Sequence, residues 1–353
     1  MILEFTHRTL PAHVFAARHA HFERMRAEVL PDDPPYDLCS AWAHFRQRPK
    51  WWRFTTWVFW HHGRIAAEAN LGFVDLPSNP HLSHPYVSVE PELRRHGIGA
   101  RLLSLAVAGA IRERRQLLIT STTDRVPAGR RFAERYGFRR GIETHLNQLA
   151  LTGLDRGLMA HWITAASERA ADYVVEIWDG LIPESDIVGF ADLATVMNSA
   201  PRGRLTIDDM KVTPEMIRDS ERWLFADGSR RLTAVARLPQ SGELVGFTSL
   251  SWAPKRAALV WQGDTGVRPD HRNKGLGRWL KAANARALLE ANAKARFLRT
   301  GNADINAPML AINRQMGFRP LLASVAWHAN ALAVAAHLRR ARRRLTYCRG
   351  GPW

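Results

Sequence analysis

The sequence predicts an α/β protein made of two copies of one domain in tandem, and three observations support this. The chain has 353 residues, a length typical of two domains. An Arg-x-x-Gly-x-Gly pattern occurs at residues 94–99 and again at 272–277. A Gly-Phe pair occurs at 137–138 and again, at nearly the same spacing, at 317–318. A period this long indicates a duplicated domain and not a solenoid of short repeats.

Each copy is expected to place helices and a β-hairpin before the glycine pattern, and helix, strand and helix after it. In the first copy, periodicity predicts helices at 11–30 and 36–49, strands near 53–62 and 64–75, a strand at 84–91, a helix at 97–115 and a strand at 116–122. In the second copy, it predicts helices near 184–198 and 214–226, strands near 230–238, 243–252 and 257–267, a helix at 275–294 and a strand at 295–301. In both copies, a further helix ends at the Gly-Phe glycine, which suits a C-cap because glycine adopts positive φ at little cost.

The expected boundary between the copies lies near residues 150–172. The predicted units are an N-terminal domain (1–152), a helical connector (153–171), a C-terminal domain (172–336) and a basic tail (337–353). The tail holds six arginines and no acidic residue, and we expect it to be solvated and partly disordered.

Composition limits the classes of function. The formal net charge is +17, carried by 44 Arg and six Lys. This suits a polyanionic small ligand, RNA or a membrane surface, without choosing among them. The two cysteines, Cys39 and Cys348, lie far apart, so neither a disulfide framework nor a metal site is expected. Because neither a signal-peptide pattern nor an apolar run of about 18 residues occurs, we expect a cytoplasmic protein that does not span a membrane.

A strand that enters a glycine-rich turn and then a helix is suited to binding anions. Unpaired N–H groups at the helix start and the helix dipole both favour negative charge, and glycine lets the backbone approach phosphate oxygens closely. The spacing of the glycines in Arg-x-x-Gly-x-Gly differs from that in G-x-x-x-x-G-K-[ST] and from that in G-x-G-x-x-G. It therefore predicts neither a Walker loop nor the dinucleotide fingerprint.

The order of strand, [QR]-x-x-G-x-[GA], long helix, strand, helix and Gly-Phe resembles the GCN5-related N-acetyltransferase (GNAT) family. The pattern occurs twice, and the two occurrences together cover most of the chain. The chain is therefore similar to tandem acetyltransferases such as mycothiol synthase and related actinobacterial proteins. It implies two GNAT domains, each a mixed, mostly antiparallel sheet with splayed central strands flanked by helices. It also implies that acetyl-CoA is the co-substrate, with its pyrophosphate held by the loop and its pantetheine arm lying between the splayed strands.

Carried over by position, the resemblance implies coenzyme contacts in both copies. In the second copy these are Val267, Arg272, Asn273, Lys274, Gly275, Leu276, Gly277 and Arg278. In the first copy they are Val89, Arg94, Arg95, His96, Gly97, Ile98, Gly99 and Ala100. The residues alone also allow a plainer interpretation, in which the arginines are solvated loop charges and the glycines only form turns.

The second copy is the one expected to catalyse a reaction. Asn302 and Asn306 are candidates to bond the pantetheine amides, although Asn306 also suits a simple N-cap. The first copy has Asp124 at the position matched to Asn302, and lacks the asparagine-rich helix. We therefore expect the first domain to be degenerate, with a structural or regulatory role.

Two residues are candidates for the chemistry. In the family, a tyrosine four residues before the Gly-Phe glycine often protonates the leaving thiolate; that position is Asn313 here, and Ala133 in the first copy. Neither donates a proton usefully, so water or another residue must serve. Asp264, the one carboxylate on the central strand, is the candidate base, or else a structural acceptor beside Thr265. His271 is expected to be a surface residue.

The leading hypothesis is an acetyl-CoA-dependent N-acetyltransferase that acts on the primary amine of a small molecule by direct attack on the thioester. The alternatives are an aminoacyl-tRNA-dependent transferase of the same fold, and a non-catalytic coenzyme A sensor or nucleic-acid-binding protein that uses the basic tail. The acceptor is not specified by any residue pattern.

Overall fold

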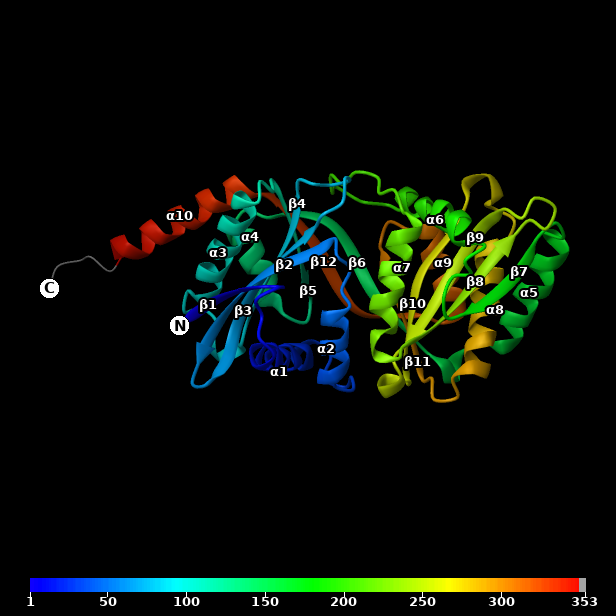
Figure 1. Ribbon diagram of the computed structural model, residues 1–353, viewed down its shortest axis with the longest axis horizontal. Helices are drawn as coiled ribbons and strands as arrows, with labels where there is room; N and C mark the ends of the chain where they lie inside the picture. Colours follow the sequence, from blue (N-terminus) through cyan, green and yellow to red (C-terminus); the bar gives the residue numbers. More distant parts are fainter. Residues whose placement is uncertain (349–353) are drawn as a thin grey trace.

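One twelve-stranded sheet runs through the computed structural model, which describes residues 1–348 (Figure 1). The strands are β1 (Ile2–Thr6), β2 (Trp52–His61), β3 (Arg64–Val74), β4 (Leu82–Val89), β5 (Leu117–Thr123), β6 (Arg139–Ala150), β7 (Val174–Asp179), β8 (Arg230–Arg237), β9 (Leu244–Trp252), β10 (Leu259–Val267), β11 (Phe297–Ala303) and β12 (Arg319–Asn330). The helices of the described part are α1 (Ala12–Val29), α2 (Leu38–Arg46), α3 (Ile98–Arg112), α4 (Pro127–Arg135), α5 (Arg156–Arg169), α6 (Ile187–Ala194), α7 (Pro214–Leu224), α8 (Leu276–Ala291), α9 (Ala307–Met316) and α10 (Ala331–Cys348). Nearly all the elements expected from periodicity are present within a few residues, whereas the edge strands β1 and β7 were not predicted.

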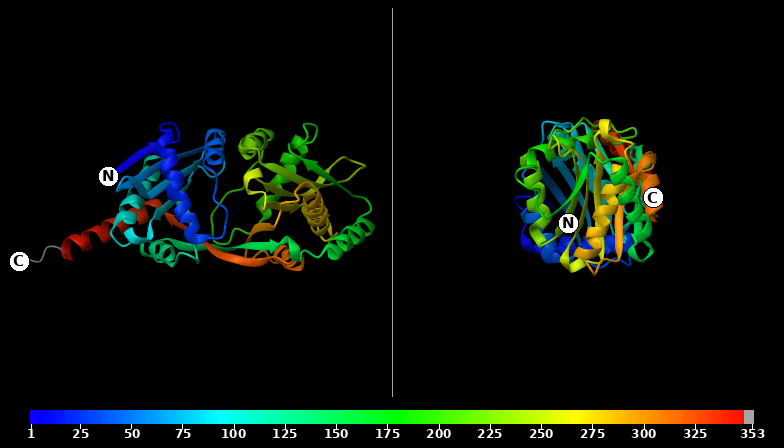
Figure 2. Two further views of the ribbon diagram at one scale, coloured as in Figure 1. Left: turned by 90° about the horizontal axis from the view of Figure 1, so that it is seen from below. Right: turned by 90° about the vertical axis from the view of Figure 1, so that its right-hand side faces the viewer.

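The two halves exchange their last strands. The sheet order is β1-β2-β3-β4-β5-β12-β6-β11-β10-β9-β8-β7. β6, which ends the first copy, pairs with β11 of the second, and β12, which ends the second copy, pairs with β5 of the first. Figures 1 and 2 show β6 and β12 crossing side by side between the two lobes. Each lobe is therefore completed by a strand from the other half of the sequence.

The exchange has approximate two-fold symmetry. At its centre, β6 pairs with β12 antiparallel, with Ser324 opposite Thr144, the residue at the equivalent position of the first copy. Asn147 on β6 lies opposite Thr300, and the equivalent pair in the other lobe is Trp327 on β12 opposite Thr120. Corresponding positions of the two copies can therefore be compared directly.

Separate apolar cores lie under the helices of each lobe. In the N-terminal lobe, α3 buries Leu102, Leu103 and Ala106 against the sheet. In the C-terminal lobe, α8 buries Leu280 and Leu288. The predicted connector helix is α5, and it buries Met159, Trp162 and Ala166 in the C-terminal core.

The segment expected as a solvated tail begins as an ordered helix, which corrects the sequence expectation. Helix α10 follows β12 without a break, and Val334 is fully buried in the N-terminal core, with Leu338 and Ala341 packed against that core. The apolar positions of this segment recur at helical spacing and cover α3, so residues 337–341 belong to the fold. Residues 349–353 of the predicted tail lie outside the described part.

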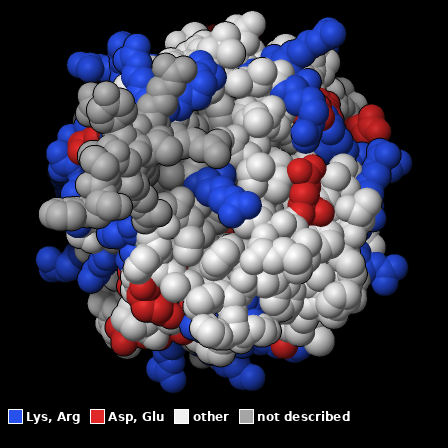
Figure 3. All heavy atoms as spheres, turned by 90° about the vertical axis from the view of Figure 1, so that its left-hand side faces the viewer, with Lys and Arg blue, Asp and Glu red and all other residues white. Residues whose placement is uncertain are grey.

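Basic side chains predominate over acidic ones on one end of the molecule. On the end face shown in Figure 3, Lys and Arg outnumber Asp and Glu and gather along the rim. This distribution agrees with the net charge of +17. Among residues 1–348, no helix combines the length and the apolar character needed to cross a bilayer.

Candidate active site

The two glycine loops have the same backbone conformation. Arg95 and Asn273 both adopt positive φ, at 70° and 65°, which is uncommon for residues with a Cβ. Two residues later, Gly97 and Gly275 adopt φ of 82° and 86° as the N-caps of α3 and α8. Glycine is the residue that adopts this conformation without strain. The duplication has therefore preserved the path of the loop as well as its sequence.

The backbone of the second loop offers a row of free donors. In the described part of the chain, the N–H groups of residues 273–277 donate to no protein acceptor, and the N-cap of α8 has no side-chain hydrogen bond. Successive N–H groups next to residues with positive φ form an anion-binding concavity, and the dipole of α8 adds positive potential there. A Cβ at Gly275 would meet only Ala166, at 3.7 Å, so the approach is open. The loop therefore fits a pyrophosphate, as expected for coenzyme A.

The first arginine of each loop, Arg94 or Arg272, bonds to a backbone carbonyl of the preceding strand. Only in the first copy is its charge also neutralised by a carboxylate. The Nε atoms of Arg272 and Arg94 donate to the carbonyls of Val267 and Val89, at 3.0 and 2.9 Å. The guanidinium of Arg94 also forms an ion pair with Glu28. Arg272 instead donates to the hydroxyl of Ser199, at 2.9 Å. The second loop therefore keeps a positive charge that the first loop has neutralised.

Two further cations surround the second loop. Lys274 donates to the hydroxyl of Tyr173 at 2.7 Å, and the same hydroxyl lies 2.8 Å from Nδ1 of His271. His271 is thus partly exposed and hydrogen-bonded beside the loop. Arg278 donates to Gln315 on α9, at 3.2 Å. In the first copy, His96 and Ala100 stand in place of Lys274 and Arg278, so the first loop carries fewer cations than the second.

The glycine loop at 272–277, which we call the phosphate cradle, lies at the end of β10, where β10 and its neighbour β11 separate. β10 and β11 pair in parallel up to Trp261 and Arg299, where their register ends. β10 also carries a bulge, since Gly263 and Asp264 both lie opposite the single residue Ser249 of β9. A bulge leaves backbone groups unpaired and able to bind a ligand. The matching strand of the first copy, β4, pairs with β3 without a register shift.

Asp264 is not held by neighbouring side chains. The hydroxyl of Thr265 bonds to that of Thr248, at 2.7 Å, and within the described residues Asp264 makes neither a hydrogen bond nor an ion pair. Although its carboxylate reaches solvent, the surrounding protein desolvates it and raises its pKa above the ordinary value. The structural role that the sequence left open for Asp264, as an acceptor beside Thr265, is therefore not observed.

The three predicted asparagines lie together on β11 and α9. Asn306 caps α9 by accepting from the N–H of Met309, at 3.4 Å. Asn313 is 2% exposed, and its Nδ2 donates to Oδ1 of Asn302 at 2.7 Å, while its Oδ1 has no partner in the described part. Asn147, from the exchanged strand β6, also approaches Asn302 at 3.4 Å. The sequence did not predict the participation of β6.

The structure corrects one alignment between the copies. β5 and β11 correspond at the spacing of the two Gly-Phe pairs, so the counterpart of Asn302 is Thr122 and that of Asp304 is Asp124. Backbone contacts agree, because the N–H of Asp124 bonds to Ala323 and that of Asp304 bonds to Glu143, which are equivalent pairs in the two copies. The sequence comparison matched Asp124 to Asn302 because it applied the spacing of the glycine loops beyond α8, where the second copy is slightly longer.

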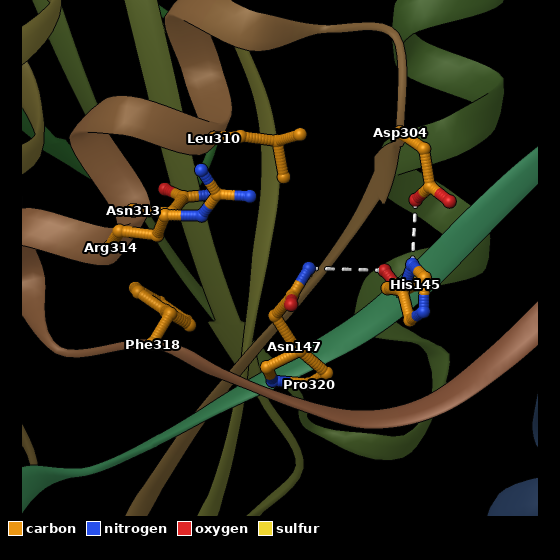
Figure 4. Close-up of a pocket in the computed structure, with 8 residues that line it drawn as sticks. All are labelled: His145, Asn147, Asp304, Leu310, Asn313, Arg314, Phe318 and Pro320. Carbon is orange, nitrogen blue, oxygen red and sulfur yellow. Dashed lines mark hydrogen bonds and ion pairs between the residues drawn. The ribbon is translucent and has the colours of Figure 1, made fainter.

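A cavity of about 290 Å³ lies between α9 and the exchanged strand (Figure 4). Its lining residues are His145, Asn147, Asp304, Leu310, Asn313, Arg314, Phe318 and Pro320. Figure 4 shows His145 and Asp304 directed toward one another across its mouth, with 2.6 Å between Nδ1 and Oδ1. A second cavity, of about 420 Å³, lies beside the loop and includes Ser199 and Arg268. Among residues 1–348, no cluster of His, Cys, Asp or Glu is arranged to hold a metal ion.

The fold and the paired loops define a class of protein, an acyltransferase with two domains. Residues 52–140 match the family described as acetyltransferase (GNAT) domain, and residues 204–318 match the acetyltransferase (GNAT) family. The two matches together span more than half of the chain. The chain therefore belongs to the GNAT family and carries two of its domains in tandem, which identifies it as an N-acetyltransferase by class.

Solved structures share this arrangement along most of the chain. A tandem GNAT protein from the clavulanic acid biosynthesis pathway is 24% identical, with a TM-score of 0.74, and the match covers 94% of this chain and 99% of that one. A GCN5-related N-acetyltransferase from Sphaerobacter thermophilus is 16% identical, with a TM-score of 0.61, covering 94% and 96%. At sequence identities of 24% and 16%, the similarity shows that this chain shares the fold of these two proteins. No curated protein sequence matches the chain.

Proposed function

We propose that the protein is an acetyl-CoA-dependent N-acetyltransferase whose working site is the C-terminal cleft between β10 and β11. The observation that carries the proposal is the row of N–H groups at 273–277 that donate to no acceptor within residues 1–348, flanked by cations that pair with no carboxylate of those residues. Arg272, Lys274 and Arg278 lie around these donors, as a pyrophosphate requires.

The proposed reaction begins with the acceptor as an ammonium ion. Asp264 accepts one of its protons, which frees the nitrogen lone pair for attack on the thioester carbon. Because the pKa of Asp264 is raised, its carboxylate is a better base than an ordinary aspartate. Unpaired N–H groups at the bulge stabilise the negative charge that develops on the carbonyl oxygen. The carbon–sulfur bond then breaks, and the products are an N-acetylated amine and coenzyme A thiol.

The N-terminal lobe is proposed to support this site and not to catalyse. Its loop has the same shape, but Glu28 neutralises Arg94, and β4 lacks the bulge. The cavity of about 420 Å³ beside the C-terminal loop suits a small acceptor in size. We infer a small-molecule amine on this basis.

Calorimetry with acetyl-CoA tests the proposal. Gly275→Glu/Gly277→Glu places side chains and negative charge in the C-terminal cradle, and should abolish binding. The matched variant, Gly97→Glu/Gly99→Glu, alters the same loop of the first copy, and should leave the rate of acetyl transfer to a panel of amines unchanged. Circular dichroism confirms that both variants are folded.

The outcomes separate the hypotheses. If the wild-type protein binds acetyl-CoA but acetylates none of the amines, the choice of acceptor is wrong. If it binds no acetyl-CoA and instead binds tRNA in a salt-sensitive manner, the transferase that uses aminoacyl-tRNA takes precedence.

A further inference from the structure

Lys281 is a cationic residue buried inside the C-terminal lobe. It lies on α8, one turn after Gly277, and is 2% exposed. Gly277 faces Ile312 of α9, and the Nζ atom of Lys281 lies 6.0 Å from the ring centroid of Phe318, which follows α9. Lys281 therefore occupies the space between α8 and α9, one helical turn inward from the phosphate cradle.

Packing does not explain a lysine at this position. In the described part of the chain, Lys281 has neither a carboxylate partner nor a hydrogen bond. An unpaired buried ammonium is costly, so a structural role would be better served by an apolar residue. The first copy provides that alternative, since the matching residue is Leu103, which is buried in the N-terminal core.

The difference extends to the cavity lined by Phe318, the residue whose ring Lys281 approaches. Asn313 and Asn147 are both nearly buried and contact Asn302. Their counterparts in the first copy are apolar and fill the core: Ala133 in place of Asn313, and Trp327 in place of Asn147. The second copy thus has a polar interior and a cavity where the first copy has a packed core. Such a change at one site of a duplicated fold indicates a chemical role.

We propose that Lys281 is the general acid of the acetyl transfer proposed above, and that its ammonium group donates a proton to the sulfur of the departing coenzyme A. As the carbon–sulfur bond breaks, the electron pair goes to sulfur, and one N–H bond of Lys281 breaks as the S–H bond forms. The neutral amine of Lys281 then takes up a proton from solvent. The proton that leaves the acceptor nitrogen after attack goes separately to Asp264, which has by then released to solvent the proton it took from the ammonium ion, so the step is balanced.

The acidity of Lys281 suits this role. Burial lowers its pKa to about 7, so that the protonated and neutral forms interconvert near neutral pH. Desolvation is the cause, and no neighbouring charge contributes. Phe318, which Lys281 approaches, also lines the cavity, and the charged residues of that lining are Arg314 on α9 and the His145–Asp304 pair. An ammonium group this acidic protonates an ordinary thiolate, whose pKa is about 8.5, in the favourable direction.

The test compares Lys281→Met with Lys294→Met, which removes an exposed lysine just beyond the same helix. We expect Lys281→Met to lower kcat by about 100-fold, the effect of losing a general acid, while KM for acetyl-CoA changes by less than about threefold. In the wild type, kcat should fall as pH rises above about 7, because the acid is then deprotonated. That descending limb should be lost in Lys281→Met and kept in Lys294→Met.

A second readout is independent of turnover. Ultraviolet absorbance of the thiolate reports the pKa of the thiol in bound coenzyme A. In the coenzyme A complex the thiolate and the ammonium of Lys281 stabilise each other and titrate as a coupled pair, so this pKa should be at least about one unit lower in the wild type than in Lys281→Met. If Lys281→Met binds coenzyme A and both the thiol pKa and the pH limb are unchanged, Lys281 is not the acid. If the wild type does not bind coenzyme A, the proposed function itself fails.

Discussion

Arg299 on β11 forms two hydrogen bonds to the carboxylate of Asp33, at 2.5 and 2.6 Å, although the two residues belong to different halves of the chain. The side chains of Arg299 and Asp33 are only 6% and 9% exposed. The Nε atom of Arg299 also donates to Gln148 on the exchanged strand, at 2.7 Å. The loop between α1 and α2 of the first half therefore fixes one of the two strands that bound the proposed cleft.

Replacing Asp33 by alanine should destabilise the whole protein. Removing one partner of a buried ion pair leaves the other charge unpaired, at a cost of about 3–5 kcal/mol. Urea unfolding measures this cost. Asp32→Ala is the matched control, because Asp32 is adjacent and exposed. A loss below about 1 kcal/mol in Asp33→Ala would show that the pair contributes no more than a surface salt bridge.

Replacing Asp264 by asparagine should remove the acid limb of the pH–rate profile. As a general base, Asp264 must be ionised, so the wild-type rate should fall as pH drops through its raised pKa, at a pH above the ordinary value of 3.8. We expect Asp264→Asn to lower kcat/KM by about 10²–10³-fold and to flatten this limb. Asp270→Asn, on the exposed turn after β10, serves as control. A limb that persists unchanged in Asp264→Asn assigns the base to another group.

Replacing Lys281 by leucine should stabilise the protein, and the gain should depend on pH. The pKa of Lys281 falls from 10.5 to about 7 on folding, so between these values the unfolded chain binds the proton that the folded chain releases. The wild type therefore becomes less stable as pH falls from about 10.5 to 7. Relative to the wild type, Lys281→Leu should gain up to about 5 kcal/mol below pH 7, and little near pH 10.5. Urea unfolding across this pH range measures the gain, and a constant difference would contradict it.

A chain that ends at residue 152 should not fold alone. It would lack β12, leaving β5 as an unpaired edge, and it would lack α10, which covers α3. Mixed with residues 153–353, it should assemble into a one-to-one complex that regains native circular dichroism. A stable monomer of residues 1–152 with a sharp thermal transition would contradict this expectation.

Local patterns in the sequence were sufficient to predict most of the elements and both glycine loops, although not the edge strands β1 and β7. The helices α3 and α8 and the positive-φ glycines depend on nearby residues, so periodicity and turn chemistry identify them. The strand exchange depends on long-range pairing. β6 and β12 would fit either lobe by their alternation, and no local signal selects the partner.

The buried lysine and the polar residues of β6 were missed for a different reason. A single lysine among helical residues normally lies on the solvated face, so the helical pattern indicated nothing unusual at Lys281. The signal was nevertheless present, because the repeat aligns Lys281 with Leu103, just as it aligns Asn313, which was noticed, with Ala133. His145 and Asn147 could not be placed, since their strand belongs by sequence to the other copy.

The crossing of β6 and β12 also sets an order of events at the ribosome. β5 is complete at Thr123, yet its partner β12 begins only at Arg319. A growing chain therefore has to keep the N-terminal sheet open, with an exposed edge, while β6 and almost the whole second copy are added. The first half of this protein to be translated is also a half that cannot be finished until β12 of the second half has emerged.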